Sequence, residues 1–176
     1  MIAPPFGTSV PDLRTAIVDV LKLRSRQPGT AVLYDMDHTE GTYAAAELLH
    51  ERFERFVLVT PRDSIAQSAP LVTRQGIVRR LSERRVDLAV LSEVRLDDGF
   101  EEGRVQCVNV YNGDVRMIEN VAFLSWSTPR APDSGLAGPL REAGIEVRVI
   151  GDCRSARGVL EATSEGHLVG NAIGED

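Results

Sequence analysis

A glycine and an aspartate near the end of the chain have the residue types and spacing that bind a nucleotide. The apolar run 147–150 (VRVI) ends at Gly151-Asp152, and the pattern predicts a short helix that opens at Ser155-Ala156. Glycine lets the backbone approach a ligand, aspartate accepts hydrogen bonds from ribose or ribityl hydroxyls, and helix N-terminal N–H groups favour phosphate. We therefore predict four cofactor-binding residues, which are Gly151, Asp152, Ser155 and Ala156.

These residues form only the closing half of such a site. The opening half is a glycine-rich G-x-G-x-x-G turn, and the sequence contains none. The two halves of the nucleotide site are therefore expected to come from different places.

A second candidate is the turn after a strand predicted at residues 30–34. It reads DMDHTEG over residues 35–41, with one glycine and three carboxylates. A pyrophosphate turn needs glycines for close approach, and like unit charges a few ångströms apart repel by about 1 kcal/mol even in water. We predict that this turn does not bind NAD(P)H. The end of the next strand offers only Arg62 as a phosphate partner.

The sequence assembles neither a catalytic nucleophile–base pair nor a metal site. Cys107 and Cys153 match no metal-ligand spacing and are expected to be buried free thiols. His38 and His50 have no ligand cluster around them in sequence and are predicted to lie on the surface, and His167 to pack on a helix. We predict no catalytic residue and no metal ligand.

Composition narrows the classes of partner. The 176 residues are 43% hydrophobic and 26% charged, which is typical of a globular chain, and the net charge of −6 argues against binding nucleic acid. The apolar runs are too short to span a membrane, and no signal peptide is evident, so we expect a cytoplasmic protein.

The elements that must position these residues alternate between strand and helix. Helices are predicted to begin at residue 12 and to cover residues 43–53, 72–81 and 136–143, with more helix after residue 150. Strands are predicted at residues 30–34, 56–60, 86–91, 104–111, 115–118, 121–126 and 147–150. Asn112-Gly113 between two of them is a strong hairpin signal.

This order predicts an α/β fold with a Rossmann-like parallel sheet and an inserted β-meander. A C-terminal α-β-α return segment of a second, incomplete flavin-type domain follows. The expected divisions are a lead-in and helix at residues 1–29, a smaller dinucleotide-type domain at residues 30–128, and an FAD/ADP-type return segment at residues 129–176.

Three segments resemble the C-terminal region of the multidomain old-yellow-enzyme relatives. This family includes trimethylamine, dimethylamine and histamine dehydrogenases and 2,4-dienoyl-CoA reductase. The first segment is residues 32–38 (VLYDMDH) with Gly41 and residues 44–49, and the second is residues 56–61 (FVLVTP) with residues 79–81. The third runs from Gly151-Asp152 to Gly166-His167 and is the most specific. The resemblance covers residues 28–173.

The resemblance implies an accessory role. Family members carry an FMN-binding TIM barrel, a four-cysteine iron–sulfur cluster and the glycine-rich start of an FAD or ADP domain, and none of these is in this sequence. The chain is therefore expected to be either a fragment of such a protein or a separate subunit, and we favour a separate, non-catalytic subunit of a heteromeric flavin-dependent oxidoreductase. A larger FMN and iron–sulfur partner would act on an amine, a methylated amine or an enoyl substrate, and the two chains would share FAD or ADP.

Two alternatives stay open. Asp35, Asp37 and Thr39 also fit the D-x-D-x-T motif of haloacid-dehalogenase-type phosphatases, which use an aspartate nucleophile and magnesium. Against this, only 25 positions separate Asp35 from Thr60, the sole lysine precedes the motif, and no second aspartate follows Gly151-Asp152 at the usual offset. The other alternative is a degenerate Rossmann-like interaction module without a ligand.

Overall fold

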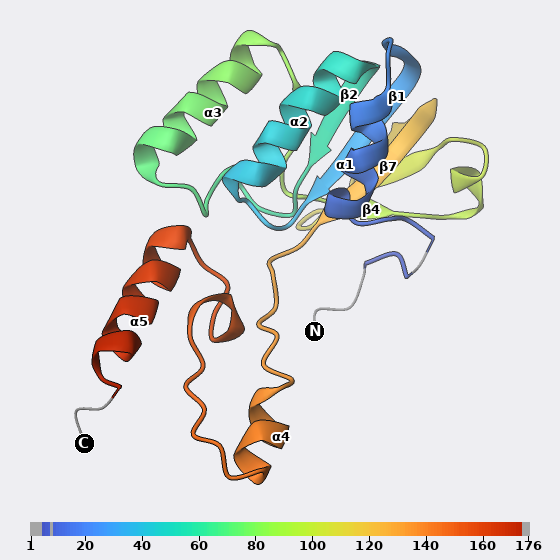
Figure 1. Ribbon diagram of the computed structural model, residues 1–176. Coiled ribbons are helices and arrows are strands. Elements are labelled where there is room, and N and C mark those ends of the chain that lie inside the picture. Colours follow the sequence, from blue (N-terminus) through green and yellow to red (C-terminus); the bar gives the residue numbers. More distant parts are fainter. Residues whose placement is uncertain (1–4, 8, 174–176) are drawn as a thin grey trace. The chain divides into compact units, whose positions relative to one another are not determined.

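The described part of the chain divides into two compact units on either side of the boundary between Thr128 and Pro129. The structure is a computed structural model that describes residues 5–7 and 9–173 (Figure 1). Within the described residues, no helix combines the length and the apolar character needed to cross a lipid bilayer.

A four-stranded parallel sheet forms the centre of the first unit. Its strands are β1 (Gln27–Asp35), β2 (Phe53–Val59), β3 (Asp87–Ala89) and β7 (Val121–Ser127), in the order β3-β2-β1-β7. Both neighbours of β1 run parallel to it. Parallel strands buried on both faces read as continuous apolar runs, which explains the burial of residues 30–35 without a break. The predicted α/β fold with a parallel sheet is confirmed.

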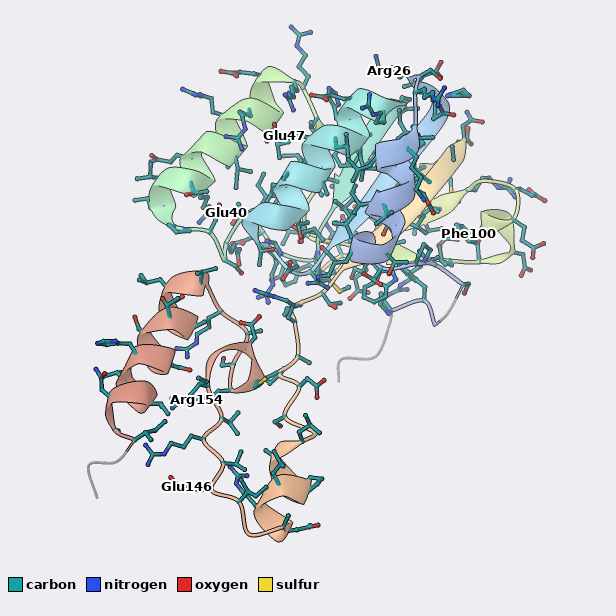
Figure 2. The ribbon with its side chains drawn as sticks, in the orientation of Figure 1. Arg26, Glu40, Glu47, Phe100, Glu146 and Arg154 are labelled. Carbon is teal, nitrogen blue, oxygen red and sulfur yellow. The ribbon has the colours of Figure 1, made fainter. Side chains whose placement is uncertain are left out.

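Alternate residues of β1 contribute to two different cores. Leu33 packs with the helices α1 (Leu13–Lys22), α2 (Glu40–Arg52) and α3 (Leu71–Glu83), whereas Val32 packs against a second sheet. Strand side chains point to opposite faces in turn, so one strand serves both layers. Helices α2 and α3 lie side by side, and Glu47 of α2 forms ion pairs with Arg80 and Arg84 of α3 (Figures 1 and 2).

The second sheet is an antiparallel meander of β4 (Ser92–Arg95), β5 (Val105–Asn109) and β6 (Val115–Ile118), with a short 3₁₀ turn, η1 (Asp98–Phe100), after β4. The Asn112-Gly113 hairpin forms as predicted. The strand predicted at residues 86–91 is shorter, because Leu91 takes a left-handed conformation at φ 52° and turns the chain into β4. This turn transfers the chain from one sheet to the other.

The C-terminal unit contains α4 (Ala137–Glu142), a 3₁₀ turn η2 (Gly151–Cys153) and α5 (Val159–Asn171). The strand predicted at residues 147–150 is not formed in this described segment, so the prediction of an α-β-α return is wrong in its middle element. A parallel strand needs a neighbouring strand for its backbone hydrogen bonds, and this unit supplies none among its described residues. Residues 147–150 keep their apolar pattern but do not form the backbone hydrogen bonds of a strand.

Candidate functional site

Gly151 lies at the start of η2 in a conformation that favours glycine. Its φ is +58°, and a Cβ added there would lie 3.4 Å from the Cβ of Ala162 in α5. The left-handed backbone favours glycine at this position, whereas the Ala162 side chain lies at ordinary van der Waals distance. The close approach of a ligand to Gly151 stays a prediction.

The Asp152 carboxylate is half exposed and forms an ion pair with Arg130. The Arg130 Nη1 to Asp152 Oδ2 distance is 2.7 Å, and the other guanidinium nitrogen donates to the carbonyl of Arg157 at 3.0 Å. An exposed pair of this kind contributes little to stability, about 0–1 kcal/mol. Asp152 can therefore exchange Arg130 for the hydroxyls of a ligand at a small energetic cost.

Glu165 of α5 fixes the other side of the same turn. Its carboxylate accepts the N–H of Gly151 at 2.8 Å and pairs with Arg157 and Arg154. The Gly151 hydrogen bond, followed by the two arginines, lowers the pKa of Glu165. The backbone donor nearest to the candidate site is therefore already occupied by a carboxylate of the same unit.

Ser155 and Ala156 do not open a helix. The helix begins at Val159, four residues later than predicted for Ser155, and Glu161 closes its first turn by accepting the N–H of Gly158 at 3.0 Å. The Ser155 N–H instead bonds the Gly151 carbonyl at 3.0 Å. The expectation that a helix opens at Ser155-Ala156 is wrong, because the η2 turn uses the Ser155 donor, whereas a contact of these residues with a nucleotide stays a prediction.

The residues present therefore fit a nucleotide only in part. Asp152 supplies an acceptor for hydroxyls and Arg130 a cation for phosphate, 2.7 Å apart in an exposed position. A glycine-rich turn and a free helix N-terminus at Ser155-Ala156 are not part of this described segment. The unit provides one wall of a candidate site.

A second polar cluster lies at the carboxyl end of β1, where open α/β sheets bind their ligands. Asp35 is the last residue of β1 and is fully buried. Its Oδ1 accepts the N–H groups of Asp37 at 3.0 Å and His38 at 2.9 Å, and the Ser127 hydroxyl at 3.1 Å. Its Oδ2 accepts the Tyr43 hydroxyl at 2.5 Å. The chain itself supplies four donors to this carboxylate.

His38 is buried in this cluster, so its predicted place on the surface is wrong. Its Nε2 lies 3.1 Å from the Thr60 hydroxyl and its Nδ1 lies 3.4 Å from the Tyr43 hydroxyl, in a backbone turn with φ 59°. Burial lowers the pKa of His38 more than the nearby Asp35 carboxylate raises it. The local sequence gives no sign of this burial, which depends on β2 and on the loop that follows it.

The phosphatase alternative requires an Asp35 carboxylate that can reach a substrate. Both of its oxygens instead accept hydrogen bonds within the chain, and the side chain is 0% exposed. Asp37 is also engaged, because it accepts the Thr39 and Thr42 hydroxyls at 2.5 and 3.2 Å. No group of three or more possible metal ligands occurs among residues 5–7 and 9–173. This geometry suits a structural network and not an aspartate nucleophile.

The two thiols occupy opposite environments. Cys107 is buried in β5, and burial raises its pKa to about 11. Cys153 is exposed and directly follows Asp152. Both are free, as predicted, but the expected burial of Cys153 is wrong.

Comparison with known proteins identifies the fold. No protein-family model matches the sequence, and no curated protein matches it. Among solved structures, histamine dehydrogenase from Rhizobium sp. 4-9 matches with a TM-score of 0.71 and 22% identity over 92% of this chain and 26% of its own. The 6-hydroxypseudooxynicotine amine oxidase of Pseudomonas geniculata N1 matches with a TM-score of 0.71 and 20% identity over 89% of this chain and 24% of its own. A 2-naphthoyl-CoA reductase follows with a TM-score of 0.66 and 18% identity, over 88% and 22%.

These likenesses confirm the predicted resemblance to the old-yellow-enzyme relatives at the level of fold. Because 92% of the chain is a larger share than residues 3–128 provide, the match extends into the C-terminal unit. The chain spans about a quarter of the length of these neighbours. Its fold is that of a region of these larger proteins.

Proposed function

We propose that this chain is an accessory subunit that completes a site for FAD or ADP in a heteromeric, cytoplasmic flavin-dependent oxidoreductase. A larger partner supplies FMN, an iron–sulfur cluster and the catalytic residues, and acts on an amine, a methylated amine or an enoyl substrate. The observation that carries the proposal is the small core of the C-terminal unit. Among its described residues, only Ala137 is buried.

A unit that buries so little needs a further surface. Ordering a residue costs about 1–2 kcal/mol of backbone entropy, and burial of apolar area at about 25 cal/mol per Å² is the main term that offsets it. Neither hydrophobic core of the chain includes any residue beyond 124 in its buried set. We infer that the missing apolar contacts come from the partner.

The exposed face of α5 supports this inference. The residues of this face are all exposed, and none of them is Asp, Glu, Lys or Arg. They are Val159, Leu160, Thr163, Ser164, His167, Leu168, Gly170 and Asn171. The two glutamates of α5 lie on the half-buried side instead. Solvated helix faces carry charged residues, so an uncharged face with exposed Leu160 and Leu168 suits contact with protein.

The segment at residues 147–150 supports the same partner. It keeps the apolar character of a buried parallel strand but forms no ladder in this unit. Adding it to the sheet of a partner would satisfy its backbone groups and bring Gly151-Asp152 to the carboxyl edge of that sheet. Nucleotides bind at this edge in open α/β sheets. The partner is therefore a chain that holds the glycine-rich half of a dinucleotide domain.

Affinity purification of the full chain from its native host tests the proposal. We expect a larger protein to co-purify with an optical spectrum of flavin and iron–sulfur cluster. Capture of a partner without that spectrum contradicts the proposal. Magnesium-dependent phosphatase activity that is lost in Asp35→Asn would establish the phosphatase alternative instead.

Asp152→Ala tests the site within that complex. A hydrogen bond to a charged group contributes about 1.5–3 kcal/mol, so retention of FAD or ADP should weaken about ten- to a hundredfold. The measurement is the nucleotide released from the denatured complex after dilution. Glu146→Ala is the matched control, since Glu146 is an exposed carboxylate of the same unit, paired only with Arg148 (Figure 2). Equal retention by the two variants would place the site elsewhere.

A further inference from the structure

The turn between β1 and α2 has the geometry of an anion-binding turn. The N–H groups of Asp37 and His38 converge on one oxygen at 3.0 and 2.9 Å, and His38 takes the left-handed conformation at φ 59°. Successive N–H groups arranged around a left-handed residue form a concave nest for anions. The hydroxyls of Ser127 and Tyr43 extend the same nest.

We infer that this nest is occupied permanently by the chain's own Asp35 carboxylate, which takes the place of a nucleotide phosphate and closes the smaller domain to NAD(P)H and ADP. Asp35 is 0% exposed, and all four donors of the nest point to its two oxygens. A phosphate could bind only after the carboxylate had left and its charge had been hydrated elsewhere.

The spacing of the acidic residues agrees with this inference. A G-x-G-x-x-G turn that started at the last residue of β1 would have glycine at positions 35, 37 and 40, and this chain has Asp35, Asp37 and Glu40 there. Asp37 is held by Thr39 and Thr42 and has an Arg14 nitrogen 3.9 Å away. Each position where a nucleotide needs a close uncharged backbone therefore carries a carboxylate.

The closure also stabilises the domain without a ligand. Tyr43 donates to Asp35 and accepts the N–H of Ala66 at 2.6 Å, so the carboxylate links β1 to the loop after β2. The Ser127 hydroxyl links the same carboxylate to β7. Asp35 thereby connects β1, β7 and the loop after β2 at the edge where a nucleotide would otherwise do so. This inference is independent of the proposed function of the C-terminal unit.

Replacement of Asp35 tests the inference on the full chain. Asp35→Ala removes a group the size of formate, so sodium formate should raise the thermal midpoint of this variant more than sodium chloride at equal ionic strength. Wild type and Asp35→Asn, whose nest is filled, should show no such difference. Asp35→Asn places an amide among four donors, and its unfolding equilibrium constant should rise about ten- to a hundredfold.

Binding of NADPH to the wild-type chain, measured by fluorescence, should be absent. Detectable NADPH binding, an Asp35→Asn variant as stable as wild type, or an Asp35→Ala variant indifferent to formate would each overturn the inference. If Asp35→Ala does not fold, the stability of Asp35→Asn and the NADPH measurement decide the question.

Discussion

Burial of an imidazole makes the stability of this protein depend on pH. His38 lies 3.1 Å from Thr60 and 3.8 Å from the Asp35 carboxylate, and burial lowers its pKa below the ordinary value of 6.5. Arg62 and Arg74 also lower the pKa, whereas Asp35 and Asp37 raise it. The net effect favours the neutral ring in the folded state.

The sign of the pH effect follows from proton binding. Below the ordinary pKa of 6.5, the His38 imidazole binds a proton more readily in the unfolded chain than in the folded chain, so its contribution makes the free energy of unfolding fall as pH falls. The slope contributed by His38 is at most about 1.4 kcal/mol per pH unit. The contribution is fully present above the unfolded pKa and is lost as pH falls toward the folded one.

We predict that His38→Asn flattens this pH dependence, since asparagine tolerates the left-handed backbone but does not titrate. Urea unfolding at several pH values measures it. His50→Gln is the control, because the pKa of His50 is also lowered, by burial and then by Arg84 and Arg26. If the slope stays unchanged in His38→Asn and is lost in His50→Gln, the pH dependence comes from His50 and not from His38.

At the scale of residues, the acidic turn shows which properties of a site can be predicted from sequence. The carboxylates of residues 35–41 predict a turn that disfavours phosphate, and this stays a prediction. They could not predict that Asp35 and His38 are buried, because their distant partners Thr60 and Ser127 come near them only when β1, β2 and β7 pair. Burial at this site is a tertiary property.

At the scale of elements, the start of β1 requires a glycine because the backbone beside it lies too close for a side chain. Gly29 has φ +87°, and a Cβ there would lie 2.8 Å from the carbonyl oxygen of Asn120. The pairing registers of β1 shift beside it. Close backbone approach and positive φ both require glycine.

Gly29→Ala is therefore expected to destabilise the chain by about 1–3 kcal/mol, from backbone strain and the clash with Asn120. Gly41→Ala is the opposite control, since Gly41 lies in α2 with open space around its Cβ position. It should stabilise by about 0.5–1 kcal/mol, because alanine favours the helix. Chemical denaturation measures both variants, and equal stabilities would show that the Asn120 contact relaxes freely.

The sequence predicts elements well where local pattern and local packing agree. The helices around residues 43–53 and 72–81 and the hairpin at Asn112-Gly113 form close to their predicted bounds. The strand at residues 86–91 is cut short by the left-handed Leu91, and the strand at 147–150 has no neighbour in its unit. A pattern of apolar residues predicts a strand but not the presence of its partner strand.

At the scale of the whole molecule, the two units differ in what stabilises them. The first unit has two extensive cores, whereas the described part of the second buries only Ala137. Leu160 and Leu168 of α5 are 74% and 68% exposed. Their side chains therefore add little to the stability of the free chain.

Leu160→Arg separates a docking role from a folding role. In the free chain it should change the free energy of unfolding by less than about 0.5 kcal/mol, because surface changes rarely do more. In the host it should abolish co-purification of the flavin spectrum, because an arginine would be buried unpaired in the interface. Leu168→Ser is a milder variant of the same face. If flavin recovery with Leu160→Arg equals that of the wild type, α5 is not part of the interface.

Because the two thiols differ in exposure, chemical labelling can report on the surface around Asp152, where we expect a nucleotide to bind. Cys153 is exposed and adjoins Asp152, whereas Cys107 is buried with a pKa raised to about 11. A maleimide dye should therefore attach at one position in the folded chain, with no engineered cysteine, because thiolate and access govern the reaction. Protection of Cys153 from the dye would then give a footprint of partner docking, and exposure of Cys107 would report global unfolding in the same sample.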